Sequence, residues 1–192
     1  GPRLLVRGGL DPAVVHVALA AGLRTLTDRL GVSSAHVTFA QVDEVETLEN
    51  AGYLHRTDTQ FHFVNDHYAA YDDFLATLAS RKRKALKRER REALASGIEI
   101  DWLSGRDLTE AVWDDFFAFY MDTGARKWGR PYLTRQFFSL IGESMADDVL
   151  LIMARRDGRH IAGALNFIGG DTLFGRNWGC IEDHPFLHFE VC

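Results

Sequence analysis

The spacing of apolar residues changes from segment to segment along the chain, and this spacing predicts the secondary structure. Between residues 13 and 30 they recur every three or four positions, which predicts an amphipathic helix. Residues 36–40 are predicted to be a strand and residues 42–50 a short helix. Apolar and polar residues alternate over 54–65, so a second strand is predicted there.

A long helix is predicted from about Tyr68 to Ser96. Its leucines and alanines form a narrow apolar stripe, and Gly97 supplies the stop signal. A strand over 98–103 is expected to follow.

The second half of the chain combines helices with closely spaced strands. Asp107 and Glu110 have the spacing of a capping box, and Thr134 is expected to cap a further helix. Three strands joined by tight, glycine-containing turns are predicted at residues 149–155, 160–168 and 172–179. Helix pairs that lead into an antiparallel meander predict a mixed α+β fold.

This pattern predicts three regions, which are an N-terminal α/β subdomain (1–67), a long linking helix (68–97) and a C-terminal subdomain (98–192). The sequence stops at Cys192, just inside a segment from Phe186 that is typical of the start of a helix. We therefore expect the C-terminus to be truncated.

The composition is that of an ordinary globular protein, with 46% hydrophobic and 26% charged residues. Its two cysteines, Cys180 and Cys192, form neither a CxxC motif nor a Cys/His cluster, so no metal site is predicted. Such sparse cysteine usage is typical of a reducing cytoplasm, which is the predicted location. The apolar stretch at 13–22 is too short to span a membrane.

The net charge of −5 conceals one strongly basic segment. Residues 81–92 hold eight Lys or Arg and two Glu, a local charge of +6 that leaves −11 for the rest of the chain. On a helix, one face would carry Arg81, Lys84, Lys87, Arg88 and Arg91. Such a row suits phosphates, whether of tRNA, of a phospholipid head group or of a lipid-linked precursor; an acidic protein surface and a merely solvated helix face remain alternatives.

Several short motifs are similar to known families. The basic segment 80–93, followed by Ser96-Gly-Ile-Glu-Ile100, resembles the basic helix of Fem-like peptidoglycan-bridge aminoacyltransferases. The stretches at 60–65, 127–134, 174–179 and 187–190 resemble bacterial proteins described as predicted N-acyltransferases or peptidoglycan biosynthesis/recognition proteins. The resemblance covers most of the chain and is strongest from about residue 54 onward.

This resemblance implies a GNAT-like fold and transfer of an acyl or aminoacyl group to an amine in cell-wall metabolism. The implied donor is acyl-CoA or aminoacyl-tRNA, and the implied acceptor is a small-molecule or lipid-linked amine. The Arg/Gln-x-x-Gly-x-Gly/Ala loop that binds the CoA pyrophosphate is missing, since Gly175 to Gly179 has the wrong spacing. That absence disfavours acetyl-CoA without excluding acyl transfer.

Candidate catalytic residues are His188 and Glu190, because amide formation needs a base for the proton of the attacking amine. Two positions apart, they would face the same way in an extended segment but diverge by roughly 200° in a helix. A structural role for both residues is the alternative.

Candidate substrate-binding residues are polar and aromatic, and lie in strands or loops. They are Arg176, Asn177 and Trp178, the loop residues Lys127, Trp128 and Tyr132, and His62. In a regular strand Arg176 and Asn177 would face opposite ways, so only one would point inward.

Two further classes of function stay open. One is a non-catalytic GNAT-like module that binds a peptidoglycan precursor or RNA through its basic helix, with peripheral membrane contact also possible. The other is a purely structural partner domain.

Overall fold

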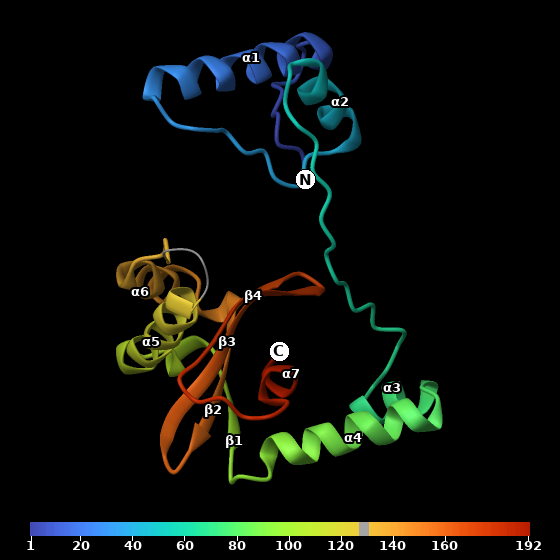
Figure 1. Cartoon of the computed structure of the whole chain (residues 1–192), viewed down its shortest axis with the longest axis vertical. Helices are drawn as coiled ribbons and strands as arrows, with labels where there is room; N and C mark the ends of the chain where they lie inside the picture. Colours follow the sequence, from blue (N-terminus) through green and yellow to red (C-terminus); the bar gives the residue numbers. More distant parts are fainter. Residues whose placement is uncertain (127–130) are drawn as a thin grey trace. The chain divides into compact units, whose positions relative to one another are not determined.

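The computed structural model describes residues 1–126 and 131–192, and the chain divides into two compact units, Gly1–Asn65 and Asp66–Cys192 (Figure 1). Each unit is described by itself.

The N-terminal unit contains two helices, α1 (Pro12–Leu30) and α2 (Val42–Asn50). The Asp11 side chain caps α1 by accepting a hydrogen bond from the N–H of Ala13, and α1 ends at Gly31 in the left-handed conformation. A small core of Leu4, Ala20 and Leu48 lies between the two helices. Both predicted helices are thus confirmed.

The strands predicted at 36–40 and 54–65 are wrong, because neither segment has regular secondary structure. A strand is stable only when a neighbouring strand takes up its main-chain hydrogen bonds, and neither segment has such a partner among the described residues. The alternating apolar side chains over 54–65 therefore lie in solvent, with Leu54 91% and Phe61 92% exposed.

The helix predicted over 68–96 is two helices, α3 (Tyr71–Thr77) and α4 (Ser80–Leu94). The break falls at Leu78, whose backbone is extended. Just before it, the Thr77 hydroxyl donates to the Phe74 carbonyl at 2.7 Å, which satisfies an acceptor that a continuous helix would have used.

A four-stranded antiparallel sheet forms the centre of the C-terminal unit. Its order follows the sequence, β1 (Glu99–Leu103), β2 (Val149–Arg156), β3 (Arg159–Gly169) and β4 (Thr172–Cys180). Asp157 and Gly158 both have positive φ in the β2–β3 turn, as a tight hairpin turn requires. The strands predicted in this half are confirmed, and the architecture is α+β.

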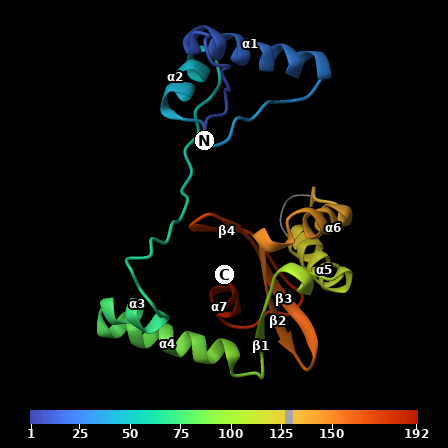
Figure 2. The ribbon, with the colours of Figure 1, turned by 180° about the vertical axis from the view of Figure 1, so that it is seen from behind.

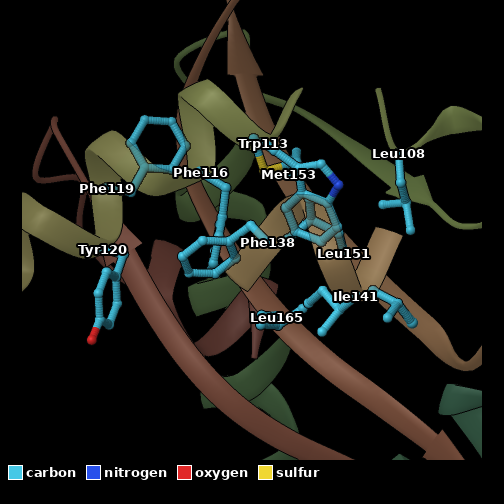
Figure 3. Close-up of a cluster of buried hydrophobic side chains, with 11 residues drawn as sticks. Leu108, Trp113, Phe116, Phe119, Tyr120, Phe138, Ile141, Leu151, Met153 and Leu165 are labelled. Atoms are coloured by element: carbon cyan, nitrogen blue, oxygen red, sulfur yellow. The ribbon is translucent and has the colours of Figure 1, made fainter. Parts of the chain in front are cut away.

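Helices cover both faces of this sheet (Figure 2). On one face lie α5 (Glu110–Arg126) and α6 (Arg135–Ser144), with a core that includes Trp113, Phe116 and Phe138 (Figure 3). On the other face the short helix α7 (Leu187–Val191) buries Leu187 and Val191.

Two 3-10 turns complete the unit, η1 (Gly105–Asp107) and η2 (Ala146–Asp148). The predicted capping box at Asp107 is wrong, because Asp107 belongs to η1 and α5 begins only at Glu110. The Thr109 hydroxyl instead accepts the N–H of Val112 at 3.4 Å. Thr134 directly precedes α6 at the N-cap position, as predicted, but its side chain makes no capping hydrogen bond with the described residues.

Candidate functional site

A β-bulge in β4 shapes the most polar part of the sheet. In the β3–β4 register, Asn177 pairs with Leu165, whereas Asn166 pairs with Gly175, so Arg176 is the extra residue. Leu165 belongs to the core beneath α5 and α6, and Asn177 opposite it therefore lies on that face. The side-chain alternation of a regular strand is broken at this point.

Arg176 reaches the same side as Asn177. Its guanidinium donates to the hydroxyl of Tyr132, from the segment that precedes α6. That segment is held by α5, because the Tyr120 hydroxyl accepts the main-chain N–H groups of Tyr132 at 3.0 Å and Leu133 at 3.1 Å. The bulge directs both residues toward the α5 side, but Arg176 is exposed whereas Asn177 is half-buried, so only Asn177 points inward, in agreement with the prediction.

Asn177 carries an unused hydrogen-bonding atom. Its Oδ1 is buried and has no partner within the described residues, and the same holds for the hydroxyl of Thr123 on α5. The two residues border one interface, since α5 lies so close to β4 that a Cβ on Gly179 would meet the Phe119 carbonyl oxygen at 2.5 Å. A buried polar atom without a partner costs roughly 1–3 kcal/mol, so each such atom calls for an explanation, such as an ordered water or a bound ligand.

The chemistry available at the bulge is specific. The Arg176 guanidinium donates hydrogen bonds and carries a positive charge, which suits a carboxylate or a carbonyl oxygen that gains negative charge. The Asn177 Oδ1 accepts, which suits the N–H of an amine or amide. Tyr132 is 68% exposed, so this site is open on the side that the phenol occupies. Lys127 and Trp128, predicted to belong to the same loop, lie outside the described residues.

His188 and Glu190 do not form a pair. Both lie on α7, where a two-residue separation directs them roughly 200° apart. The side chain of Glu190 is 15% exposed, and its carboxylate forms an ion pair with Arg90 of α4, with 3.0 Å between Oε1 and Nε. Partial burial raises the pKa of Glu190, and the charge of Arg90 acts against that rise.

The exposed ring of His188 lies against Trp178, with the ring centroids 5.0 Å apart. Trp178 packs on the core beneath α7, on the opposite face of the sheet from Asn177. The predicted C-terminal site residues are therefore divided between the two faces: Arg176, Asn177 and Tyr132 on one, and Trp178, His188 and Glu190 on the other.

The basic residues of α4 form a second feature. The helix buries Ala93 and exposes a row of five cations, Arg81, Lys84, Lys87, Arg88 and Arg91. These side chains line an open groove of about 670 Å³. The predicted common face is thus present.

His62 belongs to the other unit. It is exposed, and its Nε2 lies 3.0 Å from the Oε1 of Gln60 within the irregular segment 54–65. This local contact joins it to no other predicted site residue.

The sequence reasoning missed Tyr120 and Thr123. Tyr120 stood out only as an apolar-face residue of α5, and its hydroxyl contact with the Tyr132 segment has no sequence signal. A second missed contact joins His160 Nδ1 to Asp115 Oδ2 at 2.7 Å between β3 and α5. Within the described residues, no cluster of His, Cys, Asp and Glu is arranged to hold a metal ion.

Comparison with protein families gives a match over the whole sequence. The family model for FemAB-like proteins, described as peptidoglycan biosynthesis/recognition, matches residues 1–192. No curated protein matches the sequence. Over the described residues, no helix combines the length and the apolar character needed to cross a membrane.

Proposed function

Because the chain belongs to the FemAB-like family of peptidoglycan biosynthesis/recognition proteins, we propose that it is an N-acyltransferase acting on an amine of a cell-wall precursor. The observation that supports this activity is the buried, unpartnered Oδ1 of Asn177 next to the Arg176–Tyr132 contact. An acceptor atom and a cationic donor side by side match the two groups that react in amide formation.

In the proposed reaction, the amine nitrogen attacks the carbonyl carbon of an ester or thioester. A C–N bond forms, a C–O or C–S bond breaks, and the proton lost by nitrogen ends on the leaving oxygen or sulfur. Asn177 accepts an N–H of the amine and so orients its lone pair toward the carbonyl. Arg176 donates to the carbonyl oxygen as negative charge develops there, and Tyr132 holds the guanidinium in place.

The acyl donor belongs to one of two chemical classes, an aminoacyl-tRNA ester or an acyl-CoA thioester. The missing pyrophosphate loop favours the ester. We assign the main catalytic contribution to Arg176 and Asn177 rather than to His188 and Glu190, because Glu190 is engaged by Arg90 and His188 lies on the other face of the sheet.

The test compares activity with stability in the same variants. Asn177→Leu removes the unpartnered oxygen while keeping the side-chain size, so turnover is expected to fall about 10²–10³-fold while the melting temperature stays equal or rises. Arg176→Gln is expected to reduce turnover similarly. Turnover is measured by the transfer of a labelled acyl or aminoacyl group to an amine acceptor, and the melting temperature is measured by calorimetry.

Thr172→Val serves as the control, as a polar-to-apolar exchange at the far end of β4. It is expected to keep full turnover. The assignment is wrong if Asn177→Leu retains turnover while the double variant His188→Ala/Glu190→Ala loses it.

A second candidate function is supported by α4, whose cations favour a recognition module without catalysis. Such a module would bind a peptidoglycan precursor or RNA with strong salt dependence, and this affinity would survive Asn177→Leu. Absence of transfer with either donor class, together with retained affinity, would favour this reading.

A further inference from the structure

Helix α4 packs against the C-terminal unit through one side and exposes its basic side. Ala93 is 1% exposed, and Leu94 packs against the core beneath α7. Arg90, on the docked side, pairs with Glu190 and lies 4.8 Å from the centroid of the Tyr71 ring. The cationic face is therefore held in a fixed orientation on the C-terminal unit.

The charge on this face is largely uncompensated. Within the described residues, no carboxylate lies within ion-pair distance of Arg81, Lys84 or Arg91. Lys87 pairs with Asp72 and Arg88 with Glu92, but both pairs are exposed to solvent and so hold their cations weakly. From Arg81 to Arg91 the row is about 15 Å long, at 1.5 Å per residue.

We propose that this face of α4 binds the surface of an anionic phospholipid membrane. A straight row of cations on an exposed helix presents its charges in one plane, as a layer of phosphate head groups does, and each such cation contributes to attraction by anionic lipids. The groove between the side chains is open rather than enclosed, which fits head groups arriving from a flat surface.

RNA fits this face less well. Segment 81–92 contains no aromatic and no amide side chain, so the face offers neither a stacking platform nor groups that read base edges. The rest of the chain carries a charge of −11, which opposes a polyanion that must cover a large area.

Binding of this kind rests on charge alone. Ala93 and Leu94 of α4 face the interior of the unit, and the only apolar side chain among the cations that line the groove is that of Ala85, so this face carries no large apolar group to insert among acyl chains. Attraction should therefore disappear when salt shortens the Debye length. Membrane attachment also does not depend on the proposed acyl transfer, although it would bring the chain to the surface where a lipid-linked amine is found.

The experiment measures sedimentation of the full chain with vesicles that contain neither donor nor acceptor. Vesicles of phosphatidylglycerol with phosphatidylcholine are compared with phosphatidylcholine alone, at about 0.1 M and about 1 M salt, where the Debye length is about 10 Å and 3 Å. We expect binding only to the anionic vesicles and only at the lower salt.

The variant Arg81→Gln/Lys84→Gln/Arg91→Gln removes three cations that form no ion pair within residues 1–126 and 131–192, so the contacts that dock α4 remain. Its affinity for anionic vesicles should fall about a hundredfold. The matched control Arg7→Gln/Arg29→Gln/Arg56→Gln removes three exposed cations elsewhere and should bind like the parent chain.

Three results would overturn the proposal. They are no sedimentation with anionic vesicles, equal loss of affinity in the α4 variant and the control, and salt-sensitive binding of a structured RNA in the absence of vesicle binding. Because the readout is attachment without turnover, a negative result here leaves the acyl-transfer test unaffected.

Discussion

Glu44 illustrates how a single buried charge organises the N-terminal unit. Its fully buried carboxylate accepts the main-chain N–H groups of Arg3 and Leu4, each at 2.6 Å, and of Gln41 at 2.8 Å. The N-terminal segment is thereby tied to the first turn of α2. Burial alone would raise the pKa of Glu44, but the hydrogen bonds from these three N–H groups together lower it.

A lowered pKa in the folded state links Glu44 to the acid stability of this unit. The stabilisation is present above the unfolded pKa of about 4.5 and is lost as pH falls through the lower folded value. We expect Glu44→Gln to cost about 1–3 kcal/mol at neutral pH, because the amide has a single oxygen, so at least one of the three N–H groups loses its acceptor and faces an NH₂ donor instead. The variant should also lose stability less steeply in acid.

Hydrogen exchange of the α1 and α2 amides, measured across the acid range, tests this prediction. Glu46→Gln on the same helix is the control, because its exposed side chain leaves protection unchanged. Equal protection in the Glu44 variant and the parent chain would show that the carboxylate does not anchor the unit.

The site could be predicted from the sequence only in part. Arg176 and Asn177 lie in a strand, as the sequence predicted, but their common orientation depends on a bulge. A bulge is set by the register of β3 against β4, and single-strand alternation contains no information about register. The Tyr120–Tyr132 contact likewise depends on how α5 lies over β4.

At the scale of elements, the sequence predicted those helices and strands that are determined by residues close together in the chain. Helices α1 and α2 carry their own periodicity, and the meander strands carry both alternation and turn residues. The segment 54–65 alternates as clearly but forms no strand, because a strand also needs a neighbour. The break between α3 and α4 depends on one Thr77 hydrogen bond, which helix propensity does not predict.

The contact of α5 with β4 gives an element-scale prediction. A Cβ on Gly179 would lie 2.5 Å from the Phe119 carbonyl oxygen, and main chain cannot move aside as a side chain can. Gly179→Ala should therefore destabilise the C-terminal unit by about 1–3 kcal/mol, the usual cost of overpacking.

Gly175→Ala is the matched control on the same strand. The atom nearest to a Cβ added at Gly175 is Asn166 Oδ1, at an ordinary contact distance of 3.6 Å. The free energy of unfolding is therefore expected to fall by less than about 1 kcal/mol. Urea unfolding followed by the fluorescence of the tryptophans, including Trp113 and Trp178, measures both variants. Equal midpoints for the two would mean that α5 does not rest directly on β4.

At the scale of the whole molecule, the basic surface of α4 is separate from the proposed reaction site at the bulge of β4. Helix α4 has a net charge of +6 in a chain of net charge −5, whereas the only charged group of the Arg176–Asn177 pair at the bulge is the Arg176 guanidinium. The proposed attachment surface and the proposed reaction site thus belong to different elements of one unit. Substitutions in one are expected to leave the other intact, which is why the two proposals can be tested separately.

The division of the chain into two units gives a prediction about proteolysis. Residues 54–65 have no regular structure, and the side chain of Arg56 among them is exposed. Proteases need an extended stretch of chain, which this segment provides, whereas the many basic residues of α4 are held in a docked helix. Brief trypsin treatment should therefore cut after Arg56 before it cuts within α4.

Mass spectrometry should find an early fragment that begins at Thr57, and the Arg56→Gln variant should not yield it. If cleavage within α4 came first, the helix would open more readily than the irregular segment 54–65. The fixed display of its cations, on which membrane attachment depends, would then be lost, since a frayed helix no longer holds its charges in one plane.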